Sequence, residues 1–272
     1  MVRRAAVAGQ FYSSSRSALM KELEQCFLSP LGPGKVPTVA KAGPRRLVGA
    51  MVPHAGLVFS GPVAAHAYAE MAADGMPETV VIIGPNHTGY GRAVSASSED
   101  FETPLGVVRV DRDIVSRLRG VVEIDRTAHL YEHSLEVQLP FLQYLCPDFR
   151  IVPIVMGRQD VVMAKETAKV LREACAGKDV VFLASSDLSH YVPPEVARER
   201  DALVLDRVLH LDAEGLIGVV EANDISMCGY GPVATMLMAC GGTKARLLHY
   251  GSSGDVRPMR DVVGYAALVV ER

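Results

Sequence analysis

The sequence has no long apolar run. Nothing in its 272 residues approaches the roughly 20 consecutive apolar residues of a membrane-spanning helix. The opening segment MVRRAAVAGQFYSSS contains two arginines, but its apolar run is shorter than the hydrophobic region of a secretory signal. We therefore expect neither a membrane span nor a secretory signal.

Cysteine is scarce and irregularly spaced. The five cysteines lie far apart, are odd in number and form no C-x-x-C pair; they are Cys26, Cys146, Cys175, Cys228 and Cys240. Such spacing does not build a disulfide framework. It predicts a protein of the reducing cytoplasm.

An excess of one charge is also lacking. The chain has 28 basic and 31 acidic residues, spread along its length, for a formal net charge of -3. There is no electrostatic reason to expect nucleic acid or an anionic membrane as a partner. A small-molecule, peptide or protein partner is the better expectation.

The composition that remains is that of a folded protein with a large core. Hydrophobic residues make up 49% of the chain and charged residues 22%. No stretch has the character of a linker between domains, and residues 30–46, rich in Pro, Gly and Lys, are typical of a surface loop. We predict a single domain over residues 1–272.

Short β-branched runs alternate with amphipathic helical patterns after residue 44. The predicted strands cover 45–52, 79–84, 150–157 and 179–186, and the predicted helices cover 60–73, 160–175 and 193–209. This alternation is typical of an α/β fold in which helices cover a largely parallel sheet.

Four further runs favour a mixed sheet. The segments 93–99 and 106–110 have the pattern of a hairpin-type insertion, and 244–251 and 262–271 are strand patterns that can pair antiparallel near the end of the chain. We therefore predict a sheet that is largely parallel but mixed.

Ligand-type side chains follow three of the predicted strands. His54 follows the strand ending at Val52, His87 follows the strand ending at Gly84, and Asp187 and His190 follow the strand 179–186. Because the carboxyl ends of parallel strands meet at one edge of a sheet, we expect these side chains to converge. The sequence thus predicts a metal site at that edge.

Two histidines leave a metal site short of ligands, and Cys228 is the best candidate for the third. It precedes a Gly- and Pro-containing turn into a helix predicted to begin near Val233, and a helix N-terminus lowers a thiol's pKa. The other four cysteines lie in apolar helical patterns and are expected to be buried. Imidazole suits iron, zinc, copper and nickel, whereas participation of Asp187 would favour iron or manganese.

The remaining histidines have weaker contexts. His133 and Ser134 precede an amphipathic pattern, so His133 either serves as part of a helix cap or lines the site at a helix start that would attract anions. His129 is expected at the surface and His66 packed within a helix. His210 and His249 have no ligand-like context.

A set of motifs in fixed order resembles the Memo family. They run from AGQFY near the N-terminus to GYAALVV near the C-terminus, with VPHAG, IIGPNH, EHSLEVQLPFL, SSDLSHY and MCGYGP between them. The resemblance covers nearly the whole chain. It implies a fold like that of the catalytic subunit of class III extradiol ring-cleavage dioxygenases, which are non-haem iron enzymes with a three-layer α/β/α sandwich.

The resemblance also implies roles for individual residues. His54 and His87 match the two histidine ligands, His190 matches the acid and base of the ring-cleaving relatives, and Cys228 matches the Memo cysteine. The ring-cleaving enzymes have a glutamate where this chain has Cys228, so a thiolate replaces a carboxylate and redox chemistry becomes an alternative to ring cleavage. Asp187 would either join the ligands or hold a ligand histidine by accepting its second N–H.

The leading functional hypothesis is therefore a metal-dependent redox or dioxygenase-type enzyme of unknown substrate. Fe(II) is the expected metal, with copper or zinc as alternatives; His54, His87 and Cys228 are the ligands, and His190, Asp187 and His133 are the catalytic candidates. A non-catalytic module that binds metal or a peptide is a second hypothesis. Zinc-assisted hydrolysis, with His190 or Asp187 as the base, is a third.

A protein partner is implied by resemblance alone. Prokaryotic Memo-like proteins are associated with a radical SAM protein and a third partner of unknown function. This chain has no C-x-x-x-C-x-x-C motif of its own, so any radical chemistry would belong to the partner.

Overall fold

The centre of the sheet is parallel. In the computed structural model, which describes residues 1–272, five neighbouring strands run in one direction. In order across the sheet they are β6 (Gly106–Val110), β8 (Arg150–Met156), β3 (Thr79–Pro85), β9 (Val180–Ser185) and β2 (Leu47–Val52). All but β6 are almost wholly buried, as expected of strands covered on both faces. The predicted largely parallel α/β sheet is confirmed.

The sheet is mixed because its last strands are antiparallel. β12 (Val262–Glu271) lies against β2 on one side and β11 (Lys244–Ser252) on the other, antiparallel to both. The short β10 (His190–Val192) pairs with the beginning of β12. The antiparallel strands predicted at 244–251 and 262–271 are thus confirmed, and β12 continues the sheet beyond β2.

The insertion after β3 pairs differently from the prediction. The hairpin is formed by β5 (Asp100–Thr103) and β6, whereas β4 (Val94–Ala96) pairs antiparallel with β8 and parallel with β7 (Glu123–Ile124). The prediction had placed residues 93–99 and 106–110 in one hairpin. The register of β4 is instead set by the buried strand β8, and β1 (Val2–Arg3) extends the hairpin as a parallel neighbour of β5.

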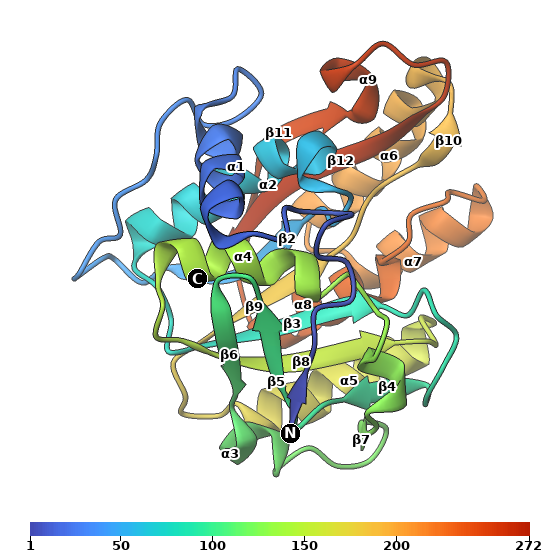
Figure 1. The fold of residues 1–272 in the computed structure, drawn as a ribbon. Coiled ribbons are helices and arrows are strands. Elements are labelled where there is room, and N and C mark those ends of the chain that lie inside the picture. Colours follow the sequence, from blue (N-terminus) through green and yellow to red (C-terminus); the bar gives the residue numbers. More distant parts are fainter.

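Helices cover both faces of the sheet and make three layers (Figure 1). One face carries α1 (Arg16–Leu28), α2 (Leu57–Asp74) and α4 (Leu139–Leu145); the other carries α5 (Val161–Ala174), α7 (Ala213–Ala222) and α8 (Tyr230–Cys240), and α6 (Pro194–Leu209) packs on β11 and β12. Connections include the short α3 (Arg112–Val115), α9 (Ser253–Val256), η1 (Thr127–His129) and η2 (Glu136–Gln138). None of these helices combines the length and the apolar character needed to cross a membrane.

The two layers of helices follow from the direction in which the chain crosses the sheet. The chain moves one way across the sheet from β2 through α2 to β3, and the opposite way from β8 through α5 to β9. Right-handed crossovers in opposite directions place their helices on opposite faces. The strand order reverses around β3, β9 and β2, and ligands of open α/β sheets bind at the carboxyl ends of strands at such a reversal.

A buried ion pair ties the N-terminal segment to the segment before α4. The Arg3 guanidinium contacts the Glu136 carboxylate and donates to the carbonyls of His129 and Glu132. Glu136 in turn accepts the backbone N–H groups of Ala6 and Val7, at 2.8 and 3.0 Å, and the Tyr12 hydroxyl, at 2.6 Å. Residues 3–12 are therefore attached to residues 129–136 by polar contacts that water does not reach.

Replacing Glu136 with alanine should destabilise the protein strongly. The change leaves the Arg3 guanidinium buried without its carboxylate, and such a loss costs about 3–5 kcal/mol. Urea unfolding followed by circular dichroism measures the change. The matched control is Glu214→Ala, which removes an exposed ion pair with Lys165 and should cost less than about 1 kcal/mol. Equal costs for the two variants would contradict this assignment.

Candidate metal centre

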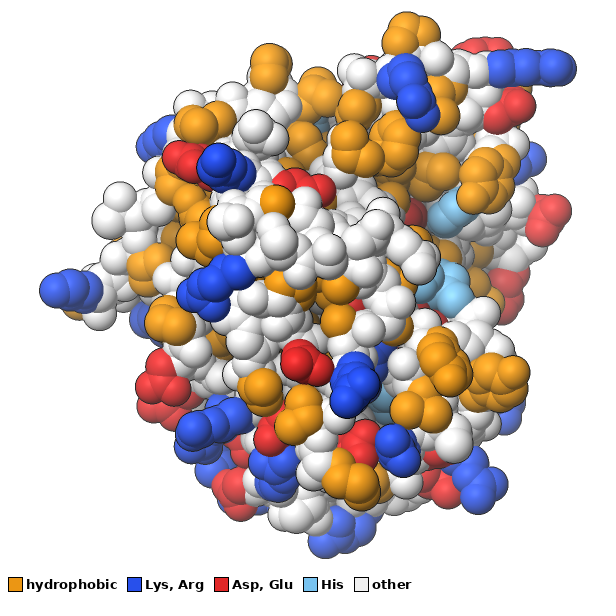
Figure 2. All heavy atoms as spheres, viewed as in Figure 1, with side chains coloured by type: hydrophobic (Ala, Val, Ile, Leu, Met, Phe, Trp, Pro, Cys, Tyr) orange, Lys and Arg blue, Asp and Glu red, His pale blue; other side chains and the backbone are white.

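Three ligand-type side chains converge at the carboxyl edge of the sheet. His54 follows β2, His87 follows β3 and Cys228 precedes α8, and one donor atom from each lies within 4.8 Å of the others. The Cys228 Sγ is 3.3 Å from the His54 Nε2, and the centroids of the two imidazole rings are 5.1 Å apart. This spacing allows two nitrogens and one sulfur to reach a single metal ion. On the face seen in Figure 2, histidine side chains lie in a recess flanked by hydrophobic groups.

The position of the His54 ring is fixed by Ser185, the last residue of β9. The Ser185 hydroxyl donates its only hydrogen to the Ser134 carbonyl, 2.7 Å away, and accepts an N–H from Gln138 at 2.8 Å. It lies 2.9 Å from the His54 Nδ1, toward which it can act only as an acceptor. The Nδ1 of His54 must therefore carry the hydrogen, and its Nε2 presents a lone pair toward Cys228.

Gln138 is itself oriented by buried groups. Its amide nitrogen also donates to the Pro53 carbonyl at 2.9 Å, and its amide oxygen accepts the Tyr68 hydroxyl at 2.7 Å. The amide therefore has one consistent orientation, and the chain of hydrogen bonds from Tyr68 to His54 is fully satisfied. Burial lowers the pKa of His54 well below its usual value, and the neighbouring charges of His87 and His133 lower it further.

The His87 ring is held by the buried carboxylate of Glu132. The Nδ1 of His87 lies 2.9 Å from Glu132 Oε1, and the same carboxylate accepts the backbone N–H groups of His87 and Ser134. Burial alone would raise the pKa of Glu132, but the hydrogen bond and charge of His87 outweigh it and hold that pKa at about 2. An ionised carboxylate only accepts, so the His87 Nδ1 donates, and in the uncharged ring the Nε2 is the nitrogen that carries the lone pair.

Cys228 is half-buried, and the direction of its pKa shift differs from the prediction. The helix begins at Tyr230 rather than near Val233, and a helix start was expected to lower the thiol's pKa. Burial, and secondly the charge of Asp187, instead raise the pKa of Cys228. The backbone N–H of Asp187 donates to Sγ over 3.3 Å. A metal cation at this point would favour the thiolate, since positive charge lowers the pKa of a coordinating thiol.

Asp187 lies beside the three donors without joining them. Its Oδ1 accepts the backbone N–H of His54 at 2.8 Å, and burial raises the pKa of its carboxyl group. It does not accept a ring N–H of either histidine, because Ser185 and Glu132 take those positions. Asp187 thus positions the loop that carries His54.

His190 lies at the same edge with one ring nitrogen free. Its Nδ1 is 2.8 Å from the Ser226 carbonyl, to which it must donate, and its backbone N–H donates to the Ser226 hydroxyl at 2.8 Å. In the uncharged ring the Nε2 is therefore an acceptor, and it has no partner in the protein. The charge of His190 is near enough to His54 to lower that residue's pKa.

His133 packs flat against His87 instead of capping a helix. The two ring centroids are 4.5 Å apart, and Phe11 from the N-terminal segment covers His133 at 4.7 Å. Burial lowers the pKa of His133 to about 4. The expected capping role is wrong: the helical turns begin later, at η2, and the Ser134 hydroxyl bonds to the Pro85 carbonyl. The Ser134 N–H is occupied by Glu132, so this turn has no open helix start for an anion.

The positions of several other residues also differ from the predictions. His129 is 2% exposed instead of lying at the surface, with its Nε2 donating to the Ser95 carbonyl at 3.2 Å. His66 is packed as expected, and its ring stacks on that of His249 at 4.6 Å. Of the four cysteines expected to be buried, Cys26 and Cys175 are buried, and Cys146 and Cys240 are half-buried.

The residues that hold the rings were missed by the sequence reasoning. Glu132 lies in the motif EHSLE and Ser185 in SSDLSHY. The sequence analysis selected His133, Asp187 and His190 from these motifs as site residues, but neither Glu132 nor Ser185. Gln138 and Ser226 lie outside any ligand-like pattern. The signal that could have found Glu132 is a carboxylate next to a candidate site histidine, since ligand histidines commonly donate their second N–H to a carboxylate.

The fold is that of an α/β protein with an open, largely parallel sheet, and the candidate centre lies at the carboxyl ends of its parallel strands. The chain belongs to the Memo family, since the family described as Memo-like protein matches residues 3–269. The resemblance expected from the motifs is thereby confirmed.

Similar proteins support this assignment along the whole chain. A MEMO1 family protein of Ignicoccus hospitalis is 50% identical over 279 residues, covering 98% of this chain and 98% of the relative. One from Methanopyrus kandleri is 45% identical over 283 residues and covers both chains completely, at 100%. The crystal structure of an uncharacterized Escherichia coli K12 protein has a TM-score of 0.59 at 14% identity, covering 82% of this chain and 100% of the other, and supports the fold alone.

Replacing Glu132 with glutamine should weaken metal binding at the proposed centre. Glu132 Oε1 accepts both the His87 Nδ1 hydrogen and the Ser134 N–H, and its other oxygen accepts the His87 N–H, so the NH2 of a glutamine faces a donor whichever way the amide lies. Because the charge and one acceptor are lost, we expect Glu132→Gln to weaken Fe(II) or Zn(II) binding by about 10- to 100-fold. Glu132→Asp, which keeps the charge, should bind the metal more tightly than Glu132→Gln; wild-type affinity in Glu132→Gln would contradict the assignment.

His129 should make the protein less stable in mild acid. Burial, and secondly Arg3, lower the pKa of His129 to about 4 in the folded protein. In the unfolded chain His129 binds a proton near pH 6.5, whereas in the folded protein it binds one only near pH 4. Stability therefore falls as the pH drops through this window. Between pH 7 and 5, His129→Gln should lose about 2 kcal/mol less unfolding free energy than the wild type. The exposed His210→Gln is the control, and identical slopes for all three proteins would contradict the prediction.

Proposed function

We propose that this protein binds one divalent metal ion, Fe(II), through the Nε2 atoms of His54 and His87 and the Sγ of Cys228, and that it is a redox or dioxygenase-type enzyme. The observation that carries the proposal is the pair of fixed tautomers. Ser185 and Glu132 each take the Nδ1 hydrogen of one ring, so two imidazole lone pairs face the thiol.

The donor set is compatible with iron and with copper or zinc. Imidazole binds all three metals, and a thiolate adds a soft, negatively charged donor. The carboxylates of Asp187 and Glu132 are engaged by the His54 backbone and the His87 ring, so three protein ligands would leave coordination positions for an outside ligand, as in catalytic rather than structural sites. Bound iron would supply Lewis acidity and one-electron redox chemistry to that ligand.

The surrounding residues have roles that their own contacts define. His190 offers a free Nε2 as a proton acceptor, because its Nδ1 hydrogen is held by Ser226. His133, with a pKa of about 4, stays uncharged at neutral pH and forms a flat wall beside His87. Asp187 keeps the His54 loop in place.

The alternatives share this centre and differ in what it does. A non-catalytic module that binds metal or a peptide would need the same three ligands, and a zinc-assisted hydrolase would use His190 or Asp187 as the base for a metal-bound water. The association with a radical SAM protein stays a prediction. The free Nε2 of His190 favours an enzyme, since a storage site has no use for an unpaired base.

Single alanine replacements of His54, His87 and Cys228 should each weaken Fe(II) binding by about tenfold or more. Affinity is measured anaerobically on the purified proteins, and circular dichroism checks the fold. Cys240→Ala and His249→Ala serve as matched controls away from the centre. If the wild type binds no iron, copper or zinc tightly, the metal proposal fails. If iron binds but no oxygen is consumed with a broad catechol panel, the dioxygenase version fails and the binding module is preferred.

A further inference from the structure

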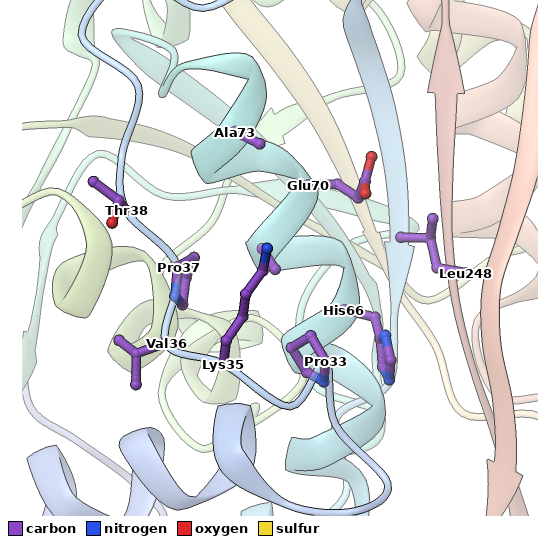
Figure 3. A pocket seen from close by; sticks show the side chains of 10 residues that line it. Pro33, Lys35, Val36, Pro37, Thr38, His66, Glu70, Ala73 and Leu248 are labelled. Atoms are coloured by element: carbon purple, nitrogen blue, oxygen red, sulfur yellow. The ribbon is translucent and has the colours of Figure 1, made fainter.

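A cavity of about 470 Å³ lies beside α2, apart from the candidate metal centre. Its walls come from one face of α2, from Pro33 and residues 35–38, and from Leu248 of β11 (Figure 3). None of the three candidate metal ligands lines this cavity. The position of each ligand is instead set by the loops packed around it.

The turn of residues 228–231 carries the Cys228 ligand and leads into α8. The Cys228 carbonyl and the Gly231 N–H are three residues apart, a spacing at which the two groups of a tight turn often bond to each other. No hydrogen bond joins them here. The Gly231 N–H is also one of the first N–H groups of α8, which a helix cannot satisfy from within. Both groups therefore need a partner from another part of the chain.

The side chain of Gln159 lies between these two groups and bonds to both. Its amide nitrogen donates to the Cys228 carbonyl and its amide oxygen accepts the Gly231 N–H, each at 2.9 Å. One orientation of the amide satisfies both contacts, because the nitrogen only donates and the oxygen only accepts. A single side chain thus closes the turn that holds Cys228.

Gln159 is itself held in place. It lies between β8 and α5, and the next residue, Asp160, caps α5 by accepting the Met163 N–H at 2.9 Å. Gly231 packs so closely on this loop that a Cβ there would lie 2.6 Å from the Gln159 Cβ. Only glycine allows such an approach. The turn and the Gln159 loop are therefore packed against each other as well as hydrogen-bonded.

The opposite side of the turn is held by the end of β9. The Ser186 hydroxyl accepts the Gly229 N–H at 2.9 Å, and the Asp187 N–H donates to the Cys228 Sγ over 3.3 Å. Neither contact reaches the Cys228 carbonyl, which is bonded by Gln159 from the side of β8. The turn is thus clamped between the ends of two strands of the sheet.

This clamp leaves the sulfur close to the position that a shared ion requires. The Cys228 Sγ lies 3.3 Å from the His54 Nε2. A sulfur and a nitrogen that bind one tetrahedral zinc-sized ion lie about 3.6 Å apart. The sulfur therefore needs only a small shift to share an ion with His54, as long as the turn keeps its place.

We propose that Gln159 is a positioning residue for Cys228: its amide holds the sulfur where a metal ion can bind both the thiolate and the histidines. This inference rests on the proposed ligand set. Without the amide, the Cys228 carbonyl loses its partner and the turn relaxes, so the thiolate leaves the ion. The histidines still bind it, because Ser185 and Glu132 hold their rings without the help of Gln159.

Co(II) is a suitable probe for this role. It accepts imidazole and thiolate ligands, and a bound thiolate gives it a strong charge-transfer absorption in the near ultraviolet. Gln159→Met keeps the length of the side chain and removes both hydrogen bonds. We expect this variant to lose most of the charge-transfer absorption and to bind Co(II) about tenfold more weakly. The visible absorption of Co(II) held by the histidines should persist, whereas a general loosening of the protein would remove both signals.

Two further variants test the same contact from different sides. Gln159→Glu still accepts the Gly231 N–H, but its ionised carboxylate cannot donate to the Cys228 carbonyl, so it should behave as Gln159→Met does. Gly231→Ala presses on the Gln159 loop and should also lose the charge-transfer absorption. The matched control is Gln143→Met. Gln143 likewise bridges a donor and an acceptor, in the β5–β6 hairpin, and its replacement should leave the Co(II) spectrum unchanged.

The outcomes separate this inference from the proposed ligand set. Cys228→Ala should lack the charge-transfer absorption, which identifies it as that of the thiolate. If the wild type shows this absorption and Gln159→Met keeps it with wild-type affinity, the role of Gln159 is overturned and the ligand set stands. If the wild type binds no Co(II), or binds it without this absorption, the ligand set is overturned and this inference with it. Circular dichroism checks the fold, and Gln159→Glu decides the question if Gln159→Met does not fold.

Discussion

The hydrogen bonds made by three residues at the end of β9 are the constraint on which the candidate metal centre depends. Ser185 accepts from the His54 ring, Ser186 accepts the Gly229 N–H beside Cys228, and Asp187 holds the His54 backbone with its carboxylate and the Cys228 sulfur with its own N–H. One buried strand end therefore positions two candidate ligands, His54 and Cys228, that are 174 residues apart. A buried polar group left without a partner costs about 1–3 kcal/mol, so each contact restricts its neighbours.

The third candidate ligand, His87, depends on a different part of the chain. Glu132 holds the His87 ring, and the Glu132 carbonyl is held by Arg3, whose own charge is balanced by Glu136. The N-terminal segment thus reaches the centre through a buried ion pair whose loss would leave a charge uncompensated. Phe11 from the same segment covers His133, so the wall of the site and the support of its ligand come from one connected set of contacts.

The parts predictable from the sequence are those that depend on local pattern. Alternating strands and helices define the parallel sheet, and loops after parallel strands bring His54 and His87 to one edge. The supporting contacts were not predictable, because Glu132 becomes a ring acceptor only when Arg3 and Glu136 fix its segment. His129 looked like a surface residue for the same reason, since long-range contacts bury it.

Gly229 shows how closely the cysteine ligand is fitted to the sheet. A Cβ at this position would lie 2.7 Å from both the Ser185 carbonyl oxygen and the Ser186 Cβ, so any larger residue would push the Cys228 loop away from β9. The Cys228 carbonyl is held from the other side by the Gln159 amide at 2.9 Å. The sulfur therefore has little freedom to move, and a metal that binds it and both histidines would have to do so with the sulfur at this position. The imidazole tautomers and the thiol position are both fixed by contacts within the protein. The candidate donor atoms are thus preorganised, because their geometry is set before any ion binds.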